Sequence, residues 1–286
     1  MLNPPEGRRG PSPSLIIAGV LIAAVAVVVL LASFTVFQLP TPVTTQAEDI
    51  EHLYWGTLAI AMAVYFLVTA GIIFAIFRYR RRSSELPEQI HGSTILEFSW
   101  TAVPVLILVG LYIPSFLLVK DLKTPPAPKD VDVQMEVIGH QWFWEFVYCK
   151  KNADGTGNCE DNTNLHIQKN PPNFNDFKPP MIVVPVGQTV RMQVRSTDVI
   201  HSFYVPHFLY KIQAVPGNVN ELHFRVTKAG TYTGQCYQFC GLRHADMRFV
   251  VQAMAPADYQ NWVNQQRQAQ GLPLESNLNA QTSGAQ

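Results

Sequence analysis

Four side chains able to bind a soft metal ion lie within one segment of twelve residues. They are Cys236, Cys240, His244 and Met247. A further imidazole, that of His201, belongs to a short run containing Phe, Tyr and Val, which predicts a β-strand. Thiolate and thioether sulfur atoms select copper over hard cations. Two thiols, two imidazoles and one thioether therefore predict a copper site.

Three other interpretations of these residues are open. Cys236 and Cys240 could form a structural disulfide, but His244 and Met247 would then have no role. A zinc site could use both cysteines with His201 and His244, but these histidines are 43 residues apart and zinc has little use for a thioether. A mononuclear blue copper site needs a single cysteine, which would leave the other surplus. The complete donor set favours two copper ions.

The spacing of the two cysteines suits such a pair of ions. Two thiolates on one tight loop can each bridge the same two ions, while His201 and His244 supply one terminal nitrogen to each. Met247 and the backbone carbonyl of Gln238 can fill weak axial positions. Because both ions share the transferred electron, bond lengths need change little on reduction, and a loop anchored to strands keeps the geometry fixed.

A second pair of cysteines predicts a different structure. Cys149 and Cys159 flank a polar, glycine-containing segment with no histidine or methionine inside it. In an oxidising compartment, a disulfide that closes this loop is the expected arrangement.

Long apolar runs occupy the first 120 residues. Residues 15–37 and 53–77 contain no charged side chain, and residues 95–119 contain only Glu97. About 20 apolar residues cross a bilayer as a helix, so three transmembrane helices are expected. The first run could alternatively be a cleaved signal peptide, but it is longer than the usual apolar region of such peptides, which favours a retained helix.

Arginines near these runs predict the orientation of the chain. Arg8 and Arg9 precede the first run, and Arg78 and residues 80–82 follow the second. Positive charges favour the cytoplasmic side. The N-terminus and the arginine loop are therefore expected in the cytoplasm, and everything after residue 120 outside.

The exported part of the chain has the pattern of a β-domain. A proline-rich linker, residues 121–130, precedes short runs rich in Val, Phe and Tyr that are separated by turn residues, which predicts an antiparallel sandwich or barrel. The expected strands are residues 131–138, 181–186, 189–194, 201–205, 222–226, 230–235 and 247–252. Residues 257–268 predict a short helix before a disordered tail.

Charge and length set the remaining expectations. The chain has 21 basic and 21 acidic residues, a balance that argues against a nucleic-acid partner. Four parts are predicted: an N-terminal segment (1–52), a transmembrane hairpin (53–120), a copper domain (121–254), and a short helix with a tail (255–286).

The order of these motifs resembles the cytochrome c oxidase subunit II family. The copper segment together with His201 is similar to the binuclear copper A site of that family. Residues 139–144 (GHQWFW) resemble its G-x-Q-W-Y-W motif, and residues 96–104 resemble the start of its second transmembrane helix. Further similar segments are residues 191–203, 214–217 and 230–236.

The resemblance implies a fold class and a set of roles. The fold would be membrane-anchored, with N-terminal transmembrane helices followed by an all-β cupredoxin-like Greek-key sandwich. Trp142 would receive electrons, and Glu97 would lie at the mouth of a proton channel in subunit I. Two copper ions would be held by His201, Cys236, the Gln238 carbonyl, Cys240, His244 and Met247.

The resemblance also implies partners and a location. The chain would accept electrons from cytochrome c or a similar one-electron carrier and pass them to heme in subunit I, where oxygen is reduced to water. Other oxidase subunits and the lipid bilayer would be further partners. The protein would lie in a prokaryotic plasma membrane, with its copper domain on the periplasmic or extracellular side.

Some features depart from the family pattern. Gln238 stands where many members have a glutamate that helps to bind magnesium, and a neutral amide is a poorer ligand for that ion, which puts a magnesium site in doubt. The apolar run at 15–37 exceeds the two helices of the family. A copper-containing subunit of a nitric oxide reductase-type enzyme is an alternative, whereas quinol oxidase subunits lack the copper ligands found here.

Overall fold

Two long apolar helices precede the β-domain. The computed structural model describes residues 38–80, 91–152 and 154–274, with four isolated positions before residue 38. The predicted span 15–37 otherwise lies outside the described residues, as do residues 81–90 and the tail from 275. Helix α2 (Thr45–Arg78) and helix α3 (Thr94–Lys123) are each long and apolar enough to cross a membrane.

Helix α2 begins eight residues before the apolar run that predicted it. The hydroxyl of Thr44 accepts a hydrogen bond from the Ala47 amide and caps the helix, and Glu48 in the first turn faces the positive end of the helix dipole. The first turns of α2 therefore contain polar residues that are helical but lie outside the apolar run predicted to cross the bilayer. The helix of the third apolar run, 95–119, likewise extends four residues beyond the C-terminal end of that run, because α3 continues to Lys123.

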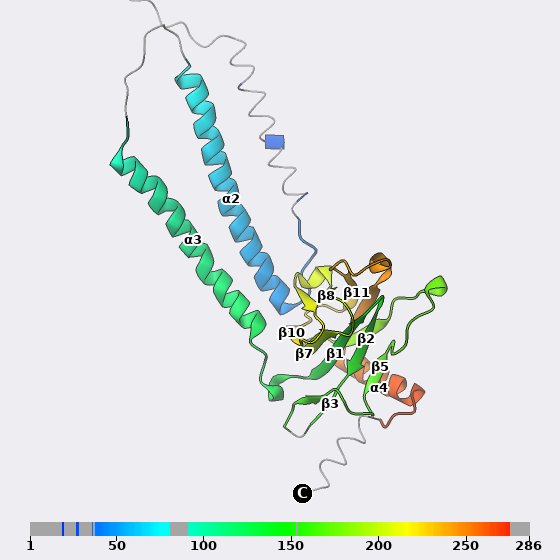
Figure 1. The fold of residues 1–286 in the computed structure, drawn as a ribbon. Helices are drawn as coiled ribbons and strands as arrows, with labels where there is room; N and C mark the ends of the chain where they lie inside the picture. The colour runs from blue at the N-terminus through cyan, green and yellow to red at the C-terminus, as the bar shows by residue number, and fades with distance from the viewer. Residues whose placement is uncertain are drawn as a thin grey trace, which may run out of the picture. The chain divides into compact units, whose positions relative to one another are not determined.

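The β-domain consists of two five-stranded sheets (Figure 1). One has the strand order β10-β7-β1-β2-β5 and the other β6-β12-β11-β8-β9. The strands are β1 (Val133–His140), β2 (Phe143–Tyr148), β5 (Leu165–Ile167), β6 (Met181–Pro185), β7 (Thr189–Ser196), β8 (His201–Tyr204), β9 (Lys211–Ala214), β10 (Asn220–Arg225), β11 (Gly230–Cys236) and β12 (Arg248–Met254). The predicted cupredoxin-like sandwich behind transmembrane helices is confirmed.

An aromatic core joins the two sheets. Trp144 and Phe146 on β2 meet Phe203 on β8 and Phe249 on β12, with ring centroids 5.5 to 6.5 Å apart, and Phe203 stacks on Phe249 at 4.6 Å. All four side chains are almost completely buried. Edge-to-face and stacked rings add to the stabilisation from apolar burial. The core therefore fixes β8, which carries His201, and β12, which directly follows Met247.

Two strand pairings differ from the antiparallel expectation. β1 pairs with β7, and β6 with β12, in parallel. Parallel neighbours need long connections rather than tight turns, and such pairings leave no local sequence signal. Strands β2, β5 and β9 were not expected either. β2 has six consecutive buried residues and so lacks the alternating pattern of a half-exposed strand.

The domain also contains several smaller elements. Strands β3 (Lys150–Lys151) and β4 (Gly157–Asn158) form a short hairpin inside the loop that the Cys149–Cys159 disulfide closes. Helix α4 (Pro256–Ala269) agrees with the short helix predicted at 257–268. Short 3-10 turns are η1 (Pro128–Asp130), η2 (Phe174–Asp176), η3 (Pro206–Phe208) and η4 (His244–Asp246).

Candidate metal centre

The sulfur-containing loop is held between two paired strands. Cys236 ends β11, and Met247 directly precedes β12, its antiparallel partner. The amide of Cys236 donates to the Met247 carbonyl at 3.0 Å, and the amide of Tyr237 donates to the Ser202 carbonyl on β8 at 3.0 Å. The base of the loop is therefore fixed from both sides, and η4 carries His244 back toward it.

Five of the predicted ligand side chains converge at this loop. The Sγ atoms of Cys236 and Cys240 are 3.9 Å apart, and both are free thiols. Cys236 Sγ lies 3.9 Å from His201 Nδ1, and Cys240 Sγ lies 3.6 Å from His244 Nδ1. Met247 Sδ is 3.9 Å from Cys240 Sγ. Each thiol thus has its own imidazole neighbour.

The sixth predicted donor is a backbone atom. The Gln238 carbonyl oxygen lies 3.2 Å from Cys236 Sγ. The Gln238 side chain is exposed, so the carbonyl rather than the amide group faces the sulfur atoms.

Four of the five ligand side chains are almost completely shielded from water. Cys236, Cys240, Met247 and His201 are 0 to 5% exposed, and His244 is half-buried. Gly139 on β1 makes room for the His201 ring, because a Cβ atom there would lie 2.7 Å from Cδ2 of His201. His201, Cys236 and Cys240 place one ligand atom each within 4.8 Å of one another, close enough to share a metal ion.

Electrostatics at the loop favour a cation. Burial opposes ionisation of the Cys236 thiol, but hydrogen bonding to His201 and the backbone outweighs it and lowers the pKa to about 7. Burial and the neighbouring Cys236 charge raise the pKa of Cys240 to about 12. A second thiolate therefore needs a positive charge beside it. This soft, buried donor set fits copper, which binds thiolate and thioether sulfur.

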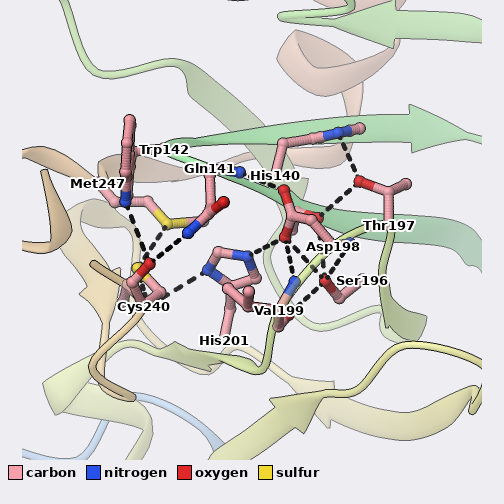
Figure 2. A network of polar contacts seen from close by, with 12 residues as sticks. His140, Gln141, Trp142, Ser196, Thr197, Asp198, Val199, His201, Cys240 and Met247 are labelled. Atoms are coloured by element: carbon pink, nitrogen blue, oxygen red, sulfur yellow. Dashed lines mark hydrogen bonds and ion pairs between the residues drawn. The ribbon is translucent and has the colours of Figure 1, made fainter. Parts of the chain in front are cut away.

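A polar network surrounds His201 (Figure 2). His201 Nε2 lies 2.8 Å from Oδ1 of Asp198, and burial of His201 is outweighed by Cys236 and Asp198, so the pKa of His201 is raised. Burial of Asp198 is likewise outweighed by bonds from His201 and from the amides of Val199 and Gln141, so the pKa of Asp198 is lowered. Asp198 therefore orients the His201 ring by binding Nε2, the ring nitrogen that does not face Cys236.

Trp142 contacts the loop directly. Its indole Nε1–H donates to the Cys240 carbonyl at 3.2 Å while the side chain is half-exposed. Gly241 permits this approach. Its φ is +120°, a region that favours glycine, and a Cβ there would lie 3.1 Å from Trp142 Nε1.

Glu97 belongs to a different element. It lies in the first turn of α3, where its amide bonds to the Ser93 carbonyl and its side chain is exposed. It is not part of the loop cluster.

Two residues of the network were not predicted from the sequence. Asp198 and Gln141 contact the ligand residues through hydrogen bonds. An aspartate three positions before a candidate histidine ligand is a signal that could have drawn attention to Asp198, because carboxylates commonly orient metal-binding histidines. Gln141 carries no such chemical signal, although it is the glutamine of the GHQWFW segment that resembles a family motif.

Two family models of one protein, which describe its external and its membrane part, match this chain. Residues 133–254 match the cytochrome c oxidase subunit II periplasmic domain, and residues 32–118 match the transmembrane domain of the same subunit. A probable cytochrome c oxidase subunit 2 of Rickettsia prowazekii is 32% identical over 224 residues, covering 78% of this chain and 69% of the relative. One of Streptomyces avermitilis is 34% identical over 248 residues, covering 78% and 76%.

A solved structure is also similar in sequence. The crystal structure of the periplasmic domain of subunit II of cytochrome oxidase of Bradyrhizobium japonicum is 31% identical, covers 51% of this chain and 97% of that chain, and has a TM-score of 0.39. The two family matches together cover the helices and the β-domain. The chain therefore belongs to the cytochrome c oxidase subunit II family, as a membrane protein with a copper-binding external domain that forms part of an oxidoreductase complex.

Proposed function

We propose that the loop holds two copper ions and that the chain is the electron-accepting subunit of a respiratory oxidase. Cys236 and Cys240 would bridge the ions, and His201 and His244 would each bind one of them. Met247 and the Gln238 carbonyl would complete the set. The observation that carries this proposal is the pairing of each of two adjacent free thiols with its own imidazole.

The chain supplies a rigid, dry setting for electron transfer. The copper pair, when bound, accepts and releases one electron at a time. The buried sulfur atoms and the strand-anchored loop keep the donor atoms in place between the two states, so little reorganisation is needed. The neutral Gln238 side chain is a weak ligand for magnesium, and magnesium is not included in the proposed site.

Trp142 is proposed as the point of electron uptake. Its ring is partly exposed, and its N–H contacts the carbonyl of Cys240. An external cytochrome c or similar one-electron carrier would dock over this ring. The indole would then connect the donor to a bridging ligand by a single hydrogen bond.

The protein that accepts electrons from the copper site is proposed to be the heme-bearing subunit I. His244 lies in a loop whose Phe239 and Leu242 side chains are 78% and 90% exposed. Large exposed apolar side chains at a functional loop are typical of protein interfaces. Electrons would leave through His244 toward heme, and oxygen reduction would occur in that partner.

The anchor is proposed to lie in a prokaryotic plasma membrane. Arg78 and Arg80 follow the apolar part of α2, which fits a cytoplasmic hairpin loop and an external β-domain. Glu97 would then lie near the cytoplasmic end of α3, where a carboxylate could serve a proton channel of subunit I. The proposed parts of the chain remain 1–52, 53–120, 121–254 and 255–286.

Metal analysis and electron paramagnetic resonance test this proposal on the full-length chain under copper-replete conditions. Two coppers per chain are expected, with hyperfine splitting from one electron shared between two copper nuclei. Cys240→Ser should remove this spectrum or convert it to that of a single copper. Zinc, one copper per wild-type chain, or an unchanged Cys240→Ser spectrum would overturn the proposal.

A further inference from the structure

We infer that Gln141 is a positioning residue that holds the cysteine loop and the His201 strand to one turn of the β-domain. The inference rests on the proposed copper site. Gln141 and Trp142 form the two-residue turn between β1 and β2, in which His140 pairs with Phe143. In Figure 2, dashed lines join Gln141 to both Cys240 and Asp198, and join Asp198 to His201.

The side chain of Gln141 binds the cysteine loop. Its Nε2 donates to the Cys240 carbonyl at 2.8 Å, and the Trp142 indole donates to the same oxygen at 3.2 Å. A carbonyl oxygen has two lone pairs, so the two donors satisfy it fully. The backbone of Cys240 is therefore fixed at the point where its thiol meets the metal.

The backbone of Gln141 binds the histidine side of the site. Its amide donates to Oδ2 of Asp198 at 2.6 Å, and Oδ1 of Asp198 lies 2.8 Å from His201 Nε2. One residue thus contacts Cys240 directly and His201 through a single carboxylate. These two candidate ligands are 39 positions apart in the chain.

Two glycines allow the turn to approach both partners. A Cβ on Gly139 would collide with the His201 ring at 2.7 Å, and a Cβ on Gly241 would lie 3.3 Å from Nε2 of Gln141. The position of the turn is fixed within the sheet, because β1 is hydrogen-bonded to β2 on one side and to β7 on the other.

The contacts have a consequence for the metal pair. If the Gln141 amide group is removed, the Asp198 contact remains because it uses the backbone, while the Cys240 carbonyl keeps only the Trp142 donor. The Cys240 end of the site can then shift relative to His201. The two copper environments become unequal, and the shared electron moves toward one of them.

Two variants of the full-length, copper-loaded chain test the inference. Gln141→Leu and Gln141→Glu keep the size of the side chain but cannot donate to the carbonyl at neutral pH. Gln268→Leu, at an exposed position of α4, is the matched control. Because loss of an outer hydrogen bond at a metal site typically costs 10–100-fold in metal affinity, both Gln141 variants should bind copper about 10-fold more weakly.

The spectrum separates positioning from general stability. Both Gln141 variants should show unequal copper hyperfine splitting when loaded, while their copper-free forms should unfold close to the denaturant midpoint of the copper-free wild type, because weaker copper binding lowers the stability of the loaded form only. Gln268→Leu should change neither property. Wild-type copper affinity and equal splitting in both Gln141 variants would overturn the inference and leave the proposed function standing. A wild-type chain that holds one copper or zinc would overturn the proposed function, and the inference with it.

Discussion

His201 and Asp198 form a carboxylate–imidazole pair in which the imidazole ring is buried and the carboxylate is partly exposed. The His201 side chain is 0% exposed and that of Asp198 is 30% exposed, with 2.8 Å between Nε2 and Oδ1. A carboxylate accepts but cannot donate when ionised, so Nε2 carries the proton. The lone pair of the ring is then on Nδ1, the atom that faces Cys236 Sγ. The pair therefore sets the tautomer that a metal ligand needs.

Replacing this carboxylate should weaken metal binding without removing any ligand. Asp198→Asn keeps the shape but can present its amide N–H to Nε2, which favours the tautomer with the proton on Nδ1. Copper affinity should fall by roughly 10–100-fold, measured by competition with a chelator. Asp258→Asn on the exposed face of α4 is the control. An Asp198→Asn chain with wild-type affinity would show that the pair has no such role.

Trp142 should matter for the rate of electron uptake and little for the copper site itself. Trp142→Phe keeps an aromatic ring but loses the N–H bond to the Cys240 carbonyl, an interaction of about 1 kcal/mol. Reduction by an external cytochrome should become slower. The copper spectrum should stay close to that of the wild type, because the bond from Gln141 to the same carbonyl, at 2.8 Å, is shorter than the lost indole bond at 3.2 Å and remains in place. Stopped-flow reduction measures the rate.

The control for this experiment is Trp262→Phe, a change in helix α4. Equal reduction rates in the Trp142→Phe and wild-type chains would assign the indole to packing alone. A lost copper spectrum would instead make Trp142 a structural support of the loop.

The chemistry of the site could be predicted from the sequence because its donors are close together in the chain. Cys236, Cys240, His244 and Met247 share one loop, and only His201 had to be joined to them. The contact between Asp198 and His201 had a signal in their spacing of three positions, but the bond from Gln141 to Cys240, which spans 99 positions, could not be predicted. Nor could strand β2, whose two faces are both buried and which therefore carries no alternation.

The Cys149–Cys159 disulfide should support stability and leave the copper site unchanged. It closes a loop with a sequence separation of 10, for which chain entropy predicts a stabilisation of up to about 3 kcal/mol. Replacing both cysteines with serine should lower the denaturant midpoint of the β-domain, followed by tryptophan fluorescence. The copper content and spectrum should stay the same. A change in copper spectrum would link this loop to the metal site.

A buried carboxylate on β2 adds a pH dependence to the domain. Glu145 is 8% exposed, and its two oxygens meet His166 Nδ1 at 2.8 Å and His140 Nε2 at 3.2 Å. Burial alone would raise the pKa of the Glu145 carboxyl, but hydrogen bonds and charge from both histidines outweigh it. The pKa therefore lies below the usual 4.5.

A lowered carboxyl pKa fixes the direction of the effect. The stabilisation from ionised Glu145 is fully present above the unfolded-state pKa and is lost as the pH falls through the lower folded-state value. Glu145→Gln should thus lower the free energy of unfolding at pH 7 by roughly 2 kcal/mol, the scale of a hydrogen bond to a charged group. The difference in the free energy of unfolding between Glu145→Gln and the wild type should become smaller below about pH 4.5, as measured by denaturant titrations across pH.

The control variant, Glu160→Gln, replaces an exposed carboxylate. If the Glu145→Gln difference stayed constant down to pH 3, the carboxylate could not be the titrating group, because protonation removes the charge on which the two imidazole contacts depend.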